Sequence, residues 1–554
     1  MIFSNMNNIR VKRYSQVLRF CRKHYSTSFV TTPIFYVNAA PHIGHLYSAV
    51  ITDAYHRFEA LRNPDKNAIF STGTDEHGIK VQQATGNKDP IAIKKYCDTI
   101  STKYKDLFDL CGINYTHYIR TTDSDHKTAV QTFWKELFSK GFIYKDHYSG
   151  WYCVPDEMFL TENQLVTKVE NGREIKVSEV SGHPVEWNEE ENYMFKLSKV
   201  KSDVLHWLKD ETKVTPSKFH KQLLVWLNED NGSFDISISR PVSRIPWGIP
   251  VPDDNSQTVY VWLDALVNYL TVAGYPNIRT WPPTVQVVGK DILKFHGIYW
   301  PAFLIAAGLE PPRKLFVHSH WMVNDEKMSK SKNNVVNPFE KIDQFTSSGF
   351  RYFLLKEGVP HSDGNYSEAQ VINMLNADLA NTLGNLLNRC TSKSVNLQQV
   401  YPSFDSLRFD EMLRNHHDTL KSLSESVCSL QHAISQPYQD LHFYKGIYEV
   451  LNVLYLANKF FEECKPWEMK KFPEEAANLS AVLHVTMEVL RICGIALLPI
   501  VPEISHQLFQ KLNVSSSRTG WKNMKPSWAD VSSQCEDIPL TNESIVLYRK
   551  IVNK

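Results

Sequence analysis

The sequence predicts an α/β protein with a doubly wound parallel sheet, an inserted connective segment and, after the sheet, an all-α helix bundle. Two short apolar runs, residues 29–36 and 285–289, each lead through a glycine-containing turn into apolar residues at helical spacing, which is the strand–turn–helix pattern of a parallel sheet. From Ser367 onward, long amphipathic stretches follow one another without a strand pattern, which indicates an antiparallel bundle. The first part is therefore expected to be Rossmann-like.

Composition restricts the class of protein. The chain has 554 residues, 42% of them hydrophobic and 22% charged, so a large core distributed over several domains is expected. The net charge of +1 gives no global basic field, and a nucleic acid would have to be bound by local patches. No apolar run approaches the roughly 18 residues typical of a membrane span, and no membrane partner is expected. The nine cysteines are scattered without a CxxC pair, which favours a reducing compartment.

The first 28 residues differ from the rest of the chain. They contain several arginines and lysines together with serine and asparagine, and the first acidic residue of the chain is Asp53. A basic, hydroxyl-bearing and acid-free start is typical of a mitochondrial presequence, which would place the protein in the mitochondrial matrix. The alternative is a disordered basic arm that contacts RNA.

The pentapeptide Pro41-His42-Ile43-Gly44-His45 follows the first apolar run and opens a helical pattern. Gly44 allows close backbone approach at this turn, and the free N–H groups at a helix start favour anions. Two imidazoles three residues apart could both hydrogen-bond a phosphate chain. Taken alone, they could equally be polar turn residues.

A second motif, Lys327-Met328-Ser329-Lys330-Ser331, places two lysines three residues apart among small hydroxyl residues. Taken alone, it could be a solvated charged loop. In this order along the chain, the two motifs resemble the HIGH and KMSKS signatures of class I aminoacyl-tRNA synthetases. The resemblance implies that both lysines close over the β and γ phosphates of ATP, with Lys330 the more important.

Strand ends supply further candidates. Asp75 follows the short apolar pattern at 68–70 and would lie at the carboxyl end of a strand, where ligands gather in a doubly wound sheet; it could instead be a turn or N-cap residue. The turn Gly289-Lys290-Asp291 ends another strand and suits a nucleotide. Between them, residues 258–270 combine aromatic and apolar side chains with one acid, Asp264, and many of these side chains are core.

The segment 150–187 resembles the zinc-knuckle insertion of methionyl-tRNA synthetases. Where zinc-bearing members have two CxxC pairs, this chain has Cys153 with Asp156 and Ser178 with Ser181. One cysteine and two serines cannot supply the four N or S ligands of a structural zinc site, so a metal-free knuckle held by packing is expected. The alternative is a site rebuilt from Cys153, His183 and a carboxylate.

With these motifs, most of residues 29–510 resembles the methionyl-tRNA synthetase family, and the basic start resembles its mitochondrial form. The insertion is too short for the editing domain of the isoleucine, valine and leucine enzymes, and no additional C-terminal module is visible, so a monomer is expected. The implied organisation is a presequence over 1–28, the two halves of the catalytic Rossmann domain over 29–120 and 258–320, a connective insertion over 121–257, a KMSKS-loop and stem-contact region over 321–366, an anticodon-binding bundle over 367–512, and a loosely docked tail over 513–554.

The resemblance implies two-step chemistry. The methionine carboxylate attacks the α-phosphorus of ATP and pyrophosphate leaves; the 3′-terminal adenosine of tRNA(Met) then takes the methionyl group and AMP leaves. Such chemistry needs positioning and charge stabilisation, with Mg²⁺ accompanying ATP. The implied catalytic residues are His42, His45, Lys327 and Lys330, and the implied ATP-binding residues are His42, Gly44, His45, Gly289, Lys290, Asp291, Lys327, Met328, Ser329, Lys330 and Ser331.

The remaining implied residues bind methionine and the CAU anticodon. Asp75 would take the substrate ammonium, and an apolar pocket would be formed by Pro33, Ile34, Tyr36, Trp262, Ala265, Leu266, Tyr269, Ile292 and His296; some family members have proline at the position of Leu266. Asn385, Arg389, Pro466 and Trp467 would read the anticodon by hydrogen bonding and stacking. Without the resemblance, Asn385 and Arg389 are a surface polar pair and Trp467 is a packing aromatic.

Three other functions share part of this pattern. A class I synthetase for another amino acid is disfavoured by the pocket aromatics and the missing editing insertion. An RNA-binding descendant without catalysis is disfavoured because both histidines and both lysines are intact. A small nucleotidyltransferase can share the paired-histidine turn, but the second lysine loop and the bundle count against it.

Overall fold

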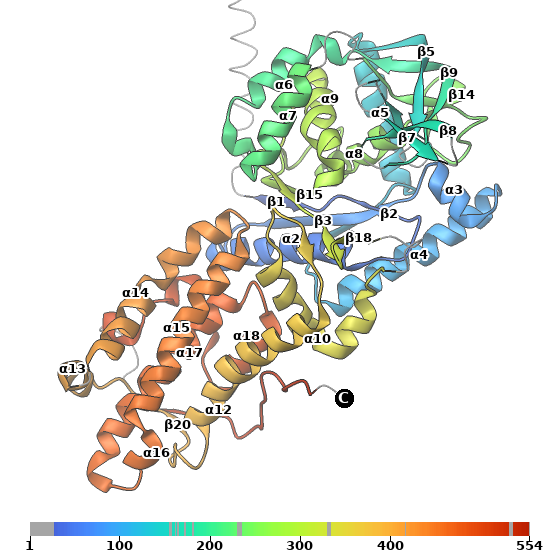
Figure 1. The fold of residues 1–554 in the computed structure, drawn as a ribbon. Coiled ribbons are helices and arrows are strands. Elements are labelled where there is room, and N and C mark those ends of the chain that lie inside the picture. Colours follow the sequence, from blue (N-terminus) through green and yellow to red (C-terminus); the bar gives the residue numbers. More distant parts are fainter. Residues whose placement is uncertain are drawn as a thin grey trace, which may run out of the picture. The chain divides into compact units, whose positions relative to one another are not determined.

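The computed structural model describes residues 27–153, 158–160, 162, 165–170, 173–179, 182–229, 235–328, 334–415, 417–530 and 536–552. The chain divides into two compact units (Figure 1). Unit 1 comprises Met1–Pro41, Ile69–Asp106 and Tyr115–Val317, and unit 2 comprises His42–Ala68, Leu107–Asn114 and His318–Lys554.

Unit 1 is built on a seven-stranded sheet. Its strands lie in the order β10-β16-β15-β1-β3-β2, and β4 also pairs with β3. The pairs β1–β15, β10–β16, β2–β3 and β3–β4 are parallel, which confirms the predicted parallel α/β core. The strands are β1 (Ser28–Thr31), β2 (Phe35–Tyr36), β3 (Ala68–Asp75), β4 (His117–Arg120), β10 (Val214–Thr215), β15 (Val285–Gly289) and β16 (Leu315–His318).

The carboxyl ends of neighbouring strands bring candidate residues to one edge of this sheet. In the β2–β3 pair Tyr36 lies opposite Asp75, and the N–H of Val37 donates to the Asp75 carbonyl over 3.0 Å. In the β1–β15 pair Thr31 lies opposite Gln286, three residues before the end of β15. Because parallel strands end on the same side of a sheet, the segments that follow β1, β3 and β15 lie at that edge.

Helices pack against one another beside this sheet around one apolar core. The core contains side chains from α5 and α8, from the helix after β15 and from the two helices of the insertion, with Trp300 fully buried among them. The helices of unit 1 are α3 (Ile79–Thr85), α4 (Pro90–Leu110, which ends in unit 2), α5 (Ser124–Ser139), α6 (Lys201–Trp207), α7 (Ser217–Glu229), α8 (Val261–Ala273) and α9 (Trp300–Ala307).

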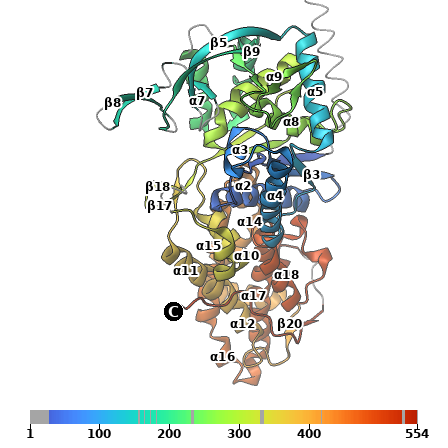
Figure 2. The same ribbon diagram turned by 90° about the vertical axis from the view of Figure 1, so that its right-hand side faces the viewer.

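The insertion forms small antiparallel sheets. One has the order β11-β9-β5-β6 and another the order β12-β14-β13, while β7 and β8 form a two-stranded hairpin that projects from the rest of unit 1 (Figure 2). The strands are β5 (Ile143–Cys153), β6 (Met158–Leu160), β7 (Leu165–Glu170), β8 (Arg173–Ser178), β9 (Glu186–Phe195), β11 (Ile236–Ser237), β12 (Ser239–Pro241), β13 (Pro250–Val251) and β14 (Asp254–Val259).

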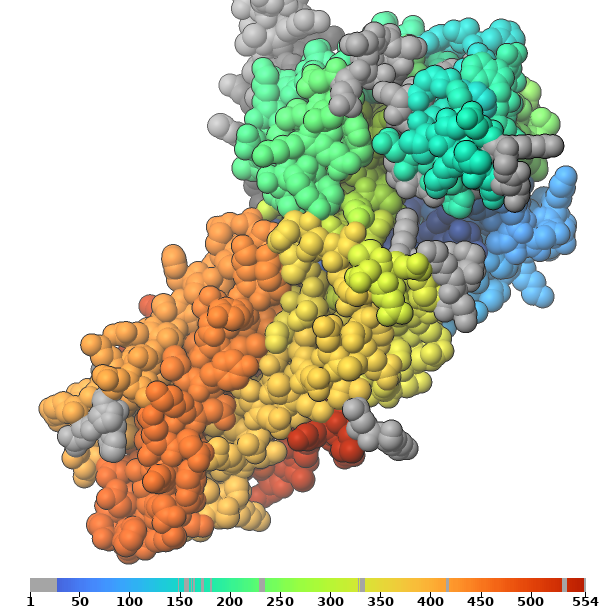
Figure 3. All heavy atoms as spheres, in the orientation of Figure 1, coloured from blue at the N-terminus to red at the C-terminus, as the bar shows by residue number. Residues whose placement is uncertain are grey.

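Unit 2 is mainly helical, as the periodicity from Ser367 predicts. Figure 3 shows α14 and α15 in orange against the yellow helices of the same unit. Ser367 is the N-cap residue of the first of the predicted stretches, and its side chain makes no capping hydrogen bond. The helices are α2 (Ile43–Arg62), α10 (Pro338–Glu357), α11 (Glu368–Leu375), the π-helix η7 (Asn376–Gly384), α12 (Asn385–Thr391), α13 (Ser406–Asn415), α14 (His417–Gln439), α15 (Phe443–Cys464), α16 (Pro466–Met469), α17 (Ala476–Leu497) and α18 (Pro502–Lys511).

The C-terminal segment does not dock loosely, contrary to prediction. Strand β21 (Ile538–Pro539) pairs antiparallel with β20 (Val400–Tyr401), a strand pair that the helical pattern did not predict. The Tyr548 hydroxyl donates to the Phe345 carbonyl inside α10 over 2.7 Å, beside Thr346, whose φ of 64° interrupts the helix. Three large apolar side chains of this polar segment, Met524, Leu540 and Leu547, are buried, which explains how it packs.

An ion pair in α17 anchors the same segment. Both Glu488 and Arg491 are buried, and Arg491 donates to Glu488 through Nε over 2.8 Å and Nη2 over 2.7 Å. Arg491 also donates to the carbonyls of Arg518, Asn523 and Lys525. A buried arginine that satisfies three carbonyls of one loop holds that loop in a defined conformation.

Acidification should therefore destabilise unit 2. Burial by itself would raise the pKa of Glu488, but Arg491 outweighs burial and holds that pKa at about 2, against an ordinary value of 4.5. A lowered native pKa stabilises the fold above the unfolded pKa, and this stabilisation, on the order of 3 kcal/mol, is lost as pH falls from about 4.5 towards 2. Urea unfolding between pH 6 and pH 3, followed by tryptophan fluorescence, measures it. Glu488→Gln should be less stable at pH 6 and show a shallower pH dependence; equal slopes for both proteins would contradict the assignment.

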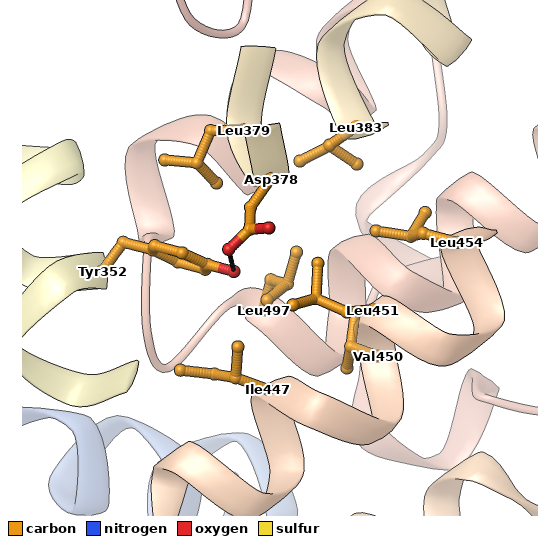
Figure 4. A pocket seen from close by; sticks show the side chains of 9 residues that line it. All are labelled: Tyr352, Asp378, Leu379, Leu383, Ile447, Val450, Leu451, Leu454 and Leu497. Carbon is orange, nitrogen blue, oxygen red and sulfur yellow. Dashed lines mark hydrogen bonds between the residues drawn. The ribbon is translucent and has the colours of Figure 1, made fainter. Parts of the chain in front are cut away.

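Two further features of unit 2 concern its interior. A cavity of about 10 Å³ lies between η7, α15 and the end of α17, where the Tyr352 hydroxyl bonds the Asp378 carboxylate over 3.0 Å among leucine side chains (Figure 4). Because this volume is close to the minimum for a single water molecule, the cavity is a packing defect without room for a substrate.

Within the described residues, one helical segment, Pro473–Leu497, is long and apolar enough to cross a membrane, and 89% of its most apolar window is buried in the protein, as in a core helix.

Candidate functional site

The paired histidines lie at the N-terminus of α2. His42 is the N-cap, and its Nδ1 accepts a hydrogen bond from the Gly44 N–H over 3.0 Å. The Nδ1 of His45 accepts from the His42 N–H over 3.2 Å, so the two imidazoles form a reciprocal capping box, a role usually filled by serine or threonine and glutamate. Their rings stack with centroids 3.8 Å apart. The helical start that the sequence predicts here is confirmed.

This capping arrangement sets the tautomer of both rings. A backbone N–H can only donate, so each Nδ1 must carry a lone pair, and in a neutral imidazole the proton is then on Nε2. Both side chains are partly exposed. The helix start therefore presents two Nε2–H donors beside its own N–H groups, which is a suitable arrangement for binding phosphate oxygens.

Gly44 is required by the position of the His42 ring. A Cβ atom on residue 44 would lie 2.9 Å from His42 Cε1 and 3.0 Å from Nδ1, closer than side chains normally approach. Any larger residue would displace the imidazole. The glycine between the histidines is thus explained by sterics rather than by an unusual backbone angle.

In unit 1, the methionine candidates fall into two groups. The first group follows the strand ends: Pro33 is buried, Ile34 and Tyr36 are half-buried, and the Asp75 side chain at the end of β3 is 7% exposed. A nearly buried carboxylate at this edge is suited to bind a cation such as an ammonium group.

The second group lies on and beside α8. Trp262 is half-buried and stacks on Phe295 with ring centroids 3.6 Å apart, while Ala265, Leu266 and Tyr269 are buried. Positions 262, 265, 266 and 269 fall on one face of the helix. Together these side chains give α8 an apolar and aromatic face.

His296 is connected to this face by hydrogen bonds. It lies in the π-helical turn η5 (Phe295–Tyr299), and its Nδ1 donates to the Ile292 carbonyl over 3.0 Å, so its Nε2 accepts from the Tyr269 hydroxyl over 2.8 Å. Burial lowers the pKa of His296 to about 4, which makes the ring neutral at physiological pH. Ile292 and His296, both implied methionine-binding residues, are therefore joined across a π-helical turn.

The nucleotide candidates are only partly described. Gly289 ends β15 and is buried, while Lys290 is half-buried and Asp291 is exposed. In unit 2, the backbone of Lys327 ends the short strand β18 (Glu326–Lys327), which pairs with β17 (Trp321–Val323), and Met328 follows it. Ser329, Lys330 and Ser331 lie outside the described residues, as does the side chain of Lys327, so the predicted lysine loop is not tested by the structure.

The anticodon candidates form one cluster at an end of unit 2. The Arg389 guanidinium lies 5.2 Å from the centre of the Trp467 ring and donates to Glu462 of α15 over 2.6 Å. Asn385, four residues before it on α12, is exposed. Pro466 is buried at the start of α16, and Trp467, which follows it, is half-buried. Unlike a core aromatic, Trp467 therefore retains an accessible part.

The knuckle residues are described in part. Cys153 ends β5 and Ser178 ends β8, and both are buried, whereas Asp156 and Ser181 lie outside the described residues. The Ser178 N–H donates to the His183 carbonyl over 2.8 Å. Among the residues whose positions are described, no group of three or more His, Cys, Asp or Glu side chains is arranged to hold a metal ion.

Unit 1 contains two buried polar groups that the sequence does not indicate. Arg240 is 1% exposed and donates to Ser237 Oγ and the Ser239 carbonyl, but its Nε has no hydrogen-bond partner and no ion pair of this side chain occurs among the described residues. Its guanidinium lies 4.3 Å from the centre of the Tyr260 ring, next to the start of α8. A bound anion would neutralise this buried charge.

The second group surrounds Asp264, which is fully buried on α8. Its Oδ2 accepts from His77 Nδ1 over 2.7 Å and its Oδ1 from His126 Nε2 over 2.8 Å. Burial by itself would raise the pKa of Asp264, but the two imidazoles lower it below its ordinary value. Neither histidine could be paired with Asp264 from the sequence, because the three residues are distant along the chain.

The chain is similar to proteins of known function. The family model described as "tRNA synthetases class I (M)" matches residues 28–391. The proteins named "methionine–tRNA ligase, mitochondrial" from Takifugu rubripes and Homo sapiens are each 46% identical, over 544 and 503 residues respectively. These alignments cover 96% and 88% of this chain, and 91% and 84% of the relatives.

A solved structure agrees with this similarity. Mycobacterium tuberculosis methionyl-tRNA synthetase in complex with methionyl-adenylate matches with a TM-score of 0.84 and 33% identity, covering 94% of this chain and 99% of that one. The similarity therefore extends over both units rather than over one motif.

Proposed function

Because the chain belongs to the methionyl-tRNA synthetases of class I, we propose a residue-level account of how it performs the reaction of that family. The enzyme is a methionine–tRNA ligase of the mitochondrial type. It joins L-methionine to tRNA(Met) through a methionyl-adenylate and releases AMP and pyrophosphate, for mitochondrial translation. The observation that carries the catalytic assignment is the pair of Nε2–H donors at the start of α2.

In the first step, a methionine carboxylate oxygen forms a bond to the α-phosphorus of ATP. The bond from that phosphorus to the oxygen bridging to the β-phosphate breaks, and pyrophosphate leaves with the electron pair. We assign His42 and His45 to donate hydrogen bonds to phosphate oxygens as negative charge redistributes, because preorganised donors stabilise charge that develops in the transition state. Gly44 and the turn Gly289–Asp291 belong to the ATP site in this account.

The lysine motif completes the ATP site in this account. Lys327 and Lys330 close over the β and γ phosphates, and Met328, Ser329 and Ser331 form the rest of the loop. A loop that closes only when ATP is bound stabilises the transition state more than the free enzyme. Mg²⁺ accompanies ATP and is held mainly by phosphate oxygens and water, as its preference for oxygen ligands favours; it neutralises phosphate charge when bound.

Methionine selection is assigned to unit 1. Asp75 binds the ammonium group, and the apolar face of α8, with Pro33, Ile34, Tyr36, Ile292 and His296, takes the thioether side chain. The neutral His296, fixed between the Ile292 carbonyl and the Tyr269 hydroxyl, provides a polar group without a charge. This suits an uncharged substrate side chain, because a buried charge here would have to be desolvated.

The bundle reads the CAU anticodon in this account, and one substitution tests it. Trp467→Ala should raise the KM for tRNA in aminoacylation, because the stacking of an unpaired base on an aromatic ring contributes about 1–3 kcal/mol. Methionine-dependent ATP–pyrophosphate exchange should remain close to wild type. Phe138→Ala, at an aromatic of unit 1 that is 53% exposed, is the control. If Trp467→Ala lowers exchange and tRNA charging together, the side chain has a folding role instead.

Several finer points complete the proposal. The enzyme acts in the mitochondrial matrix after import directed by residues 1–28, works as a monomer, and has no structural zinc in its knuckle. The domain boundaries set out from the sequence are retained with these roles. Metal analysis of the purified protein and its mass in solution by light scattering test the zinc-free and monomeric assignments.

A further inference from the structure

Helix α8 has a second polar face opposite its apolar one. Asp264 lies about 200° around the helix from Trp262, and Thr271 lies two turns further along the same polar side. This polar face contacts other elements of unit 1: Asp264 accepts from His77 and His126, and Thr271 Oγ1 lies 2.9 Å from His126 Nδ1. One helix thus has an apolar face and, opposite it, a polar face that hydrogen-bonds to other elements of unit 1.

His77 connects this polar face to the end of β3. It lies two residues after Asp75, and its side chain is 3% exposed. The segment it belongs to is held on both sides by Trp247, whose Nε1 donates to the Glu76 carbonyl over 2.6 Å and whose own carbonyl accepts from the Gly78 N–H over 3.2 Å. Movement of His77 relative to Asp75 is therefore restricted.

His126 connects the same carboxylate to α5. Its side chain is fully buried. One carboxylate thus holds three elements together: the segment that follows β3, the first turn of α5 and the first turns of α8. A buried carboxylate with two imidazole donors is costly to rearrange, because moving either partner leaves a desolvated charge with one bond fewer.

We propose that His77, Asp264 and His126 form a positioning network that holds the methionine-binding face of α8 at a set distance from the Asp75 carboxylate, and so determines the affinity for methionine. The inference rests on the proposed role of Asp75 as the ammonium site. None of these three residues contacts the substrate in this proposal. Bound methionine must place its ammonium group at Asp75 and its side chain on the apolar face of α8 at the same time. A shift of one binding surface relative to the other therefore weakens methionine binding and leaves ATP binding unchanged.

The two histidines allow a matched test, because they use different nitrogens. The amide nitrogen of asparagine can replace Nδ1 and that of glutamine can replace Nε2. His77 donates through Nδ1 and His126 through Nε2. We therefore expect His77→Asn and His126→Gln to retain methionine binding, whereas His77→Gln and His126→Asn raise the Kd for methionine about tenfold or more, the effect of leaving one buried polar group unpaired.

The measurements are the Kd for methionine by isothermal titration calorimetry, the KM values for methionine and ATP in pyrophosphate exchange, and the thermal midpoint. His220→Asn is the control, because His220 is a buried histidine of the same unit that donates through Nε2 to the Leu208 carbonyl over 2.7 Å. It should lower the thermal midpoint without changing the methionine constants. Asp264→Asn should raise the methionine KM while the ATP KM stays within about twofold, well under 1 kcal/mol.

Three outcomes overturn the network: equal effects of asparagine and glutamine at each histidine, a methionine Kd that is unchanged in folded His77→Gln and His126→Asn, or parallel increases in the KM values for methionine and ATP. Asp75→Asn separates this failure from failure of the proposed function. If Asp75→Asn weakens methionine binding and the network variants do not, the network is wrong and the ammonium site stands. If Asp75→Asn has no effect, the ammonium assignment is wrong.

Discussion

His42→Asn is expected to lower the rate of methionine-dependent ATP–pyrophosphate exchange about 10²- to 10³-fold, the usual effect of removing one preorganised donor from a transition-state site, about 3–4 kcal/mol. The thermal midpoint should change little. Asparagine is a good N-cap residue, and its carbonyl oxygen can accept the Gly44 N–H as His42 Nδ1 does. The substitution removes the Nε2–H donor and retains the helix start, so it separates catalysis from folding.

Two companion variants make this result specific. Gly44→Ala retains both histidines, but its Cβ would lie 2.9 Å from His42 Cε1, so exchange should fall although alanine favours the helix by about 0.5–1 kcal/mol. His432→Asn, at an exposed histidine of α14, should have no effect. A His42→Asn enzyme with wild-type exchange, or one that loses activity only by unfolding, would show that the imidazole is a cap and nothing more.

Arg351→Met is expected to destabilise unit 2 by about 3–5 kcal/mol, because it leaves a buried carboxylate without its main partner. Arg351 is 2% exposed and donates through Nη2 to the fully buried Asp53 of α2 over 2.6 Å. Burial by itself would raise the pKa of Asp53, but Arg351 lowers it below its ordinary value, so the pair is charged at neutral pH. Urea unfolding followed by tryptophan fluorescence measures the loss.

The position of this pair explains the size of the effect. Arg351 also donates to the carbonyls of Cys111, Pro499 and Ile500, so one side chain holds α10, α2 and the end of α17 together. Adding Asp53→Asn to Arg351→Met should recover part of the loss, because the buried carboxylate that has lost Arg351, and keeps the pair with Arg57 over 2.8 Å, is then neutralised. Arg408→Met is the control, since Arg408 makes an exposed pair with Glu411 over 2.7 Å, and such pairs contribute about 0–1 kcal/mol. Equal losses for both arginines would contradict the buried-charge argument.

The sequence by itself determined the elements and the family of this protein. Hydrophobic periodicity depends on local geometry, so the strand–turn–helix around His42, the strand that ends at Asp75 and the helical second half could all be predicted. The chemical identity of His42, Gly44 and His45 at a helix start was also readable, because a helix start has a local signature. The order of such motifs along the chain indicated the family, and the similarity to relatives along both units confirmed it.

Only the tertiary structure decided which polar groups are bonded to one another. The carboxylate of Asp264 between His77 and His126 and the Arg351–Asp53 pair join side chains from separate elements. The cap that puts the proton of both histidines on Nε2 is local to α2, but it depends on the directions of the two rings, which the sequence does not give. The same holds for the C-terminal segment, whose polar composition suggested weak docking although Glu488 and Arg491 hold it in place. Burial and pairing are properties of contacts between distant residues, and a pattern along one chain does not contain them.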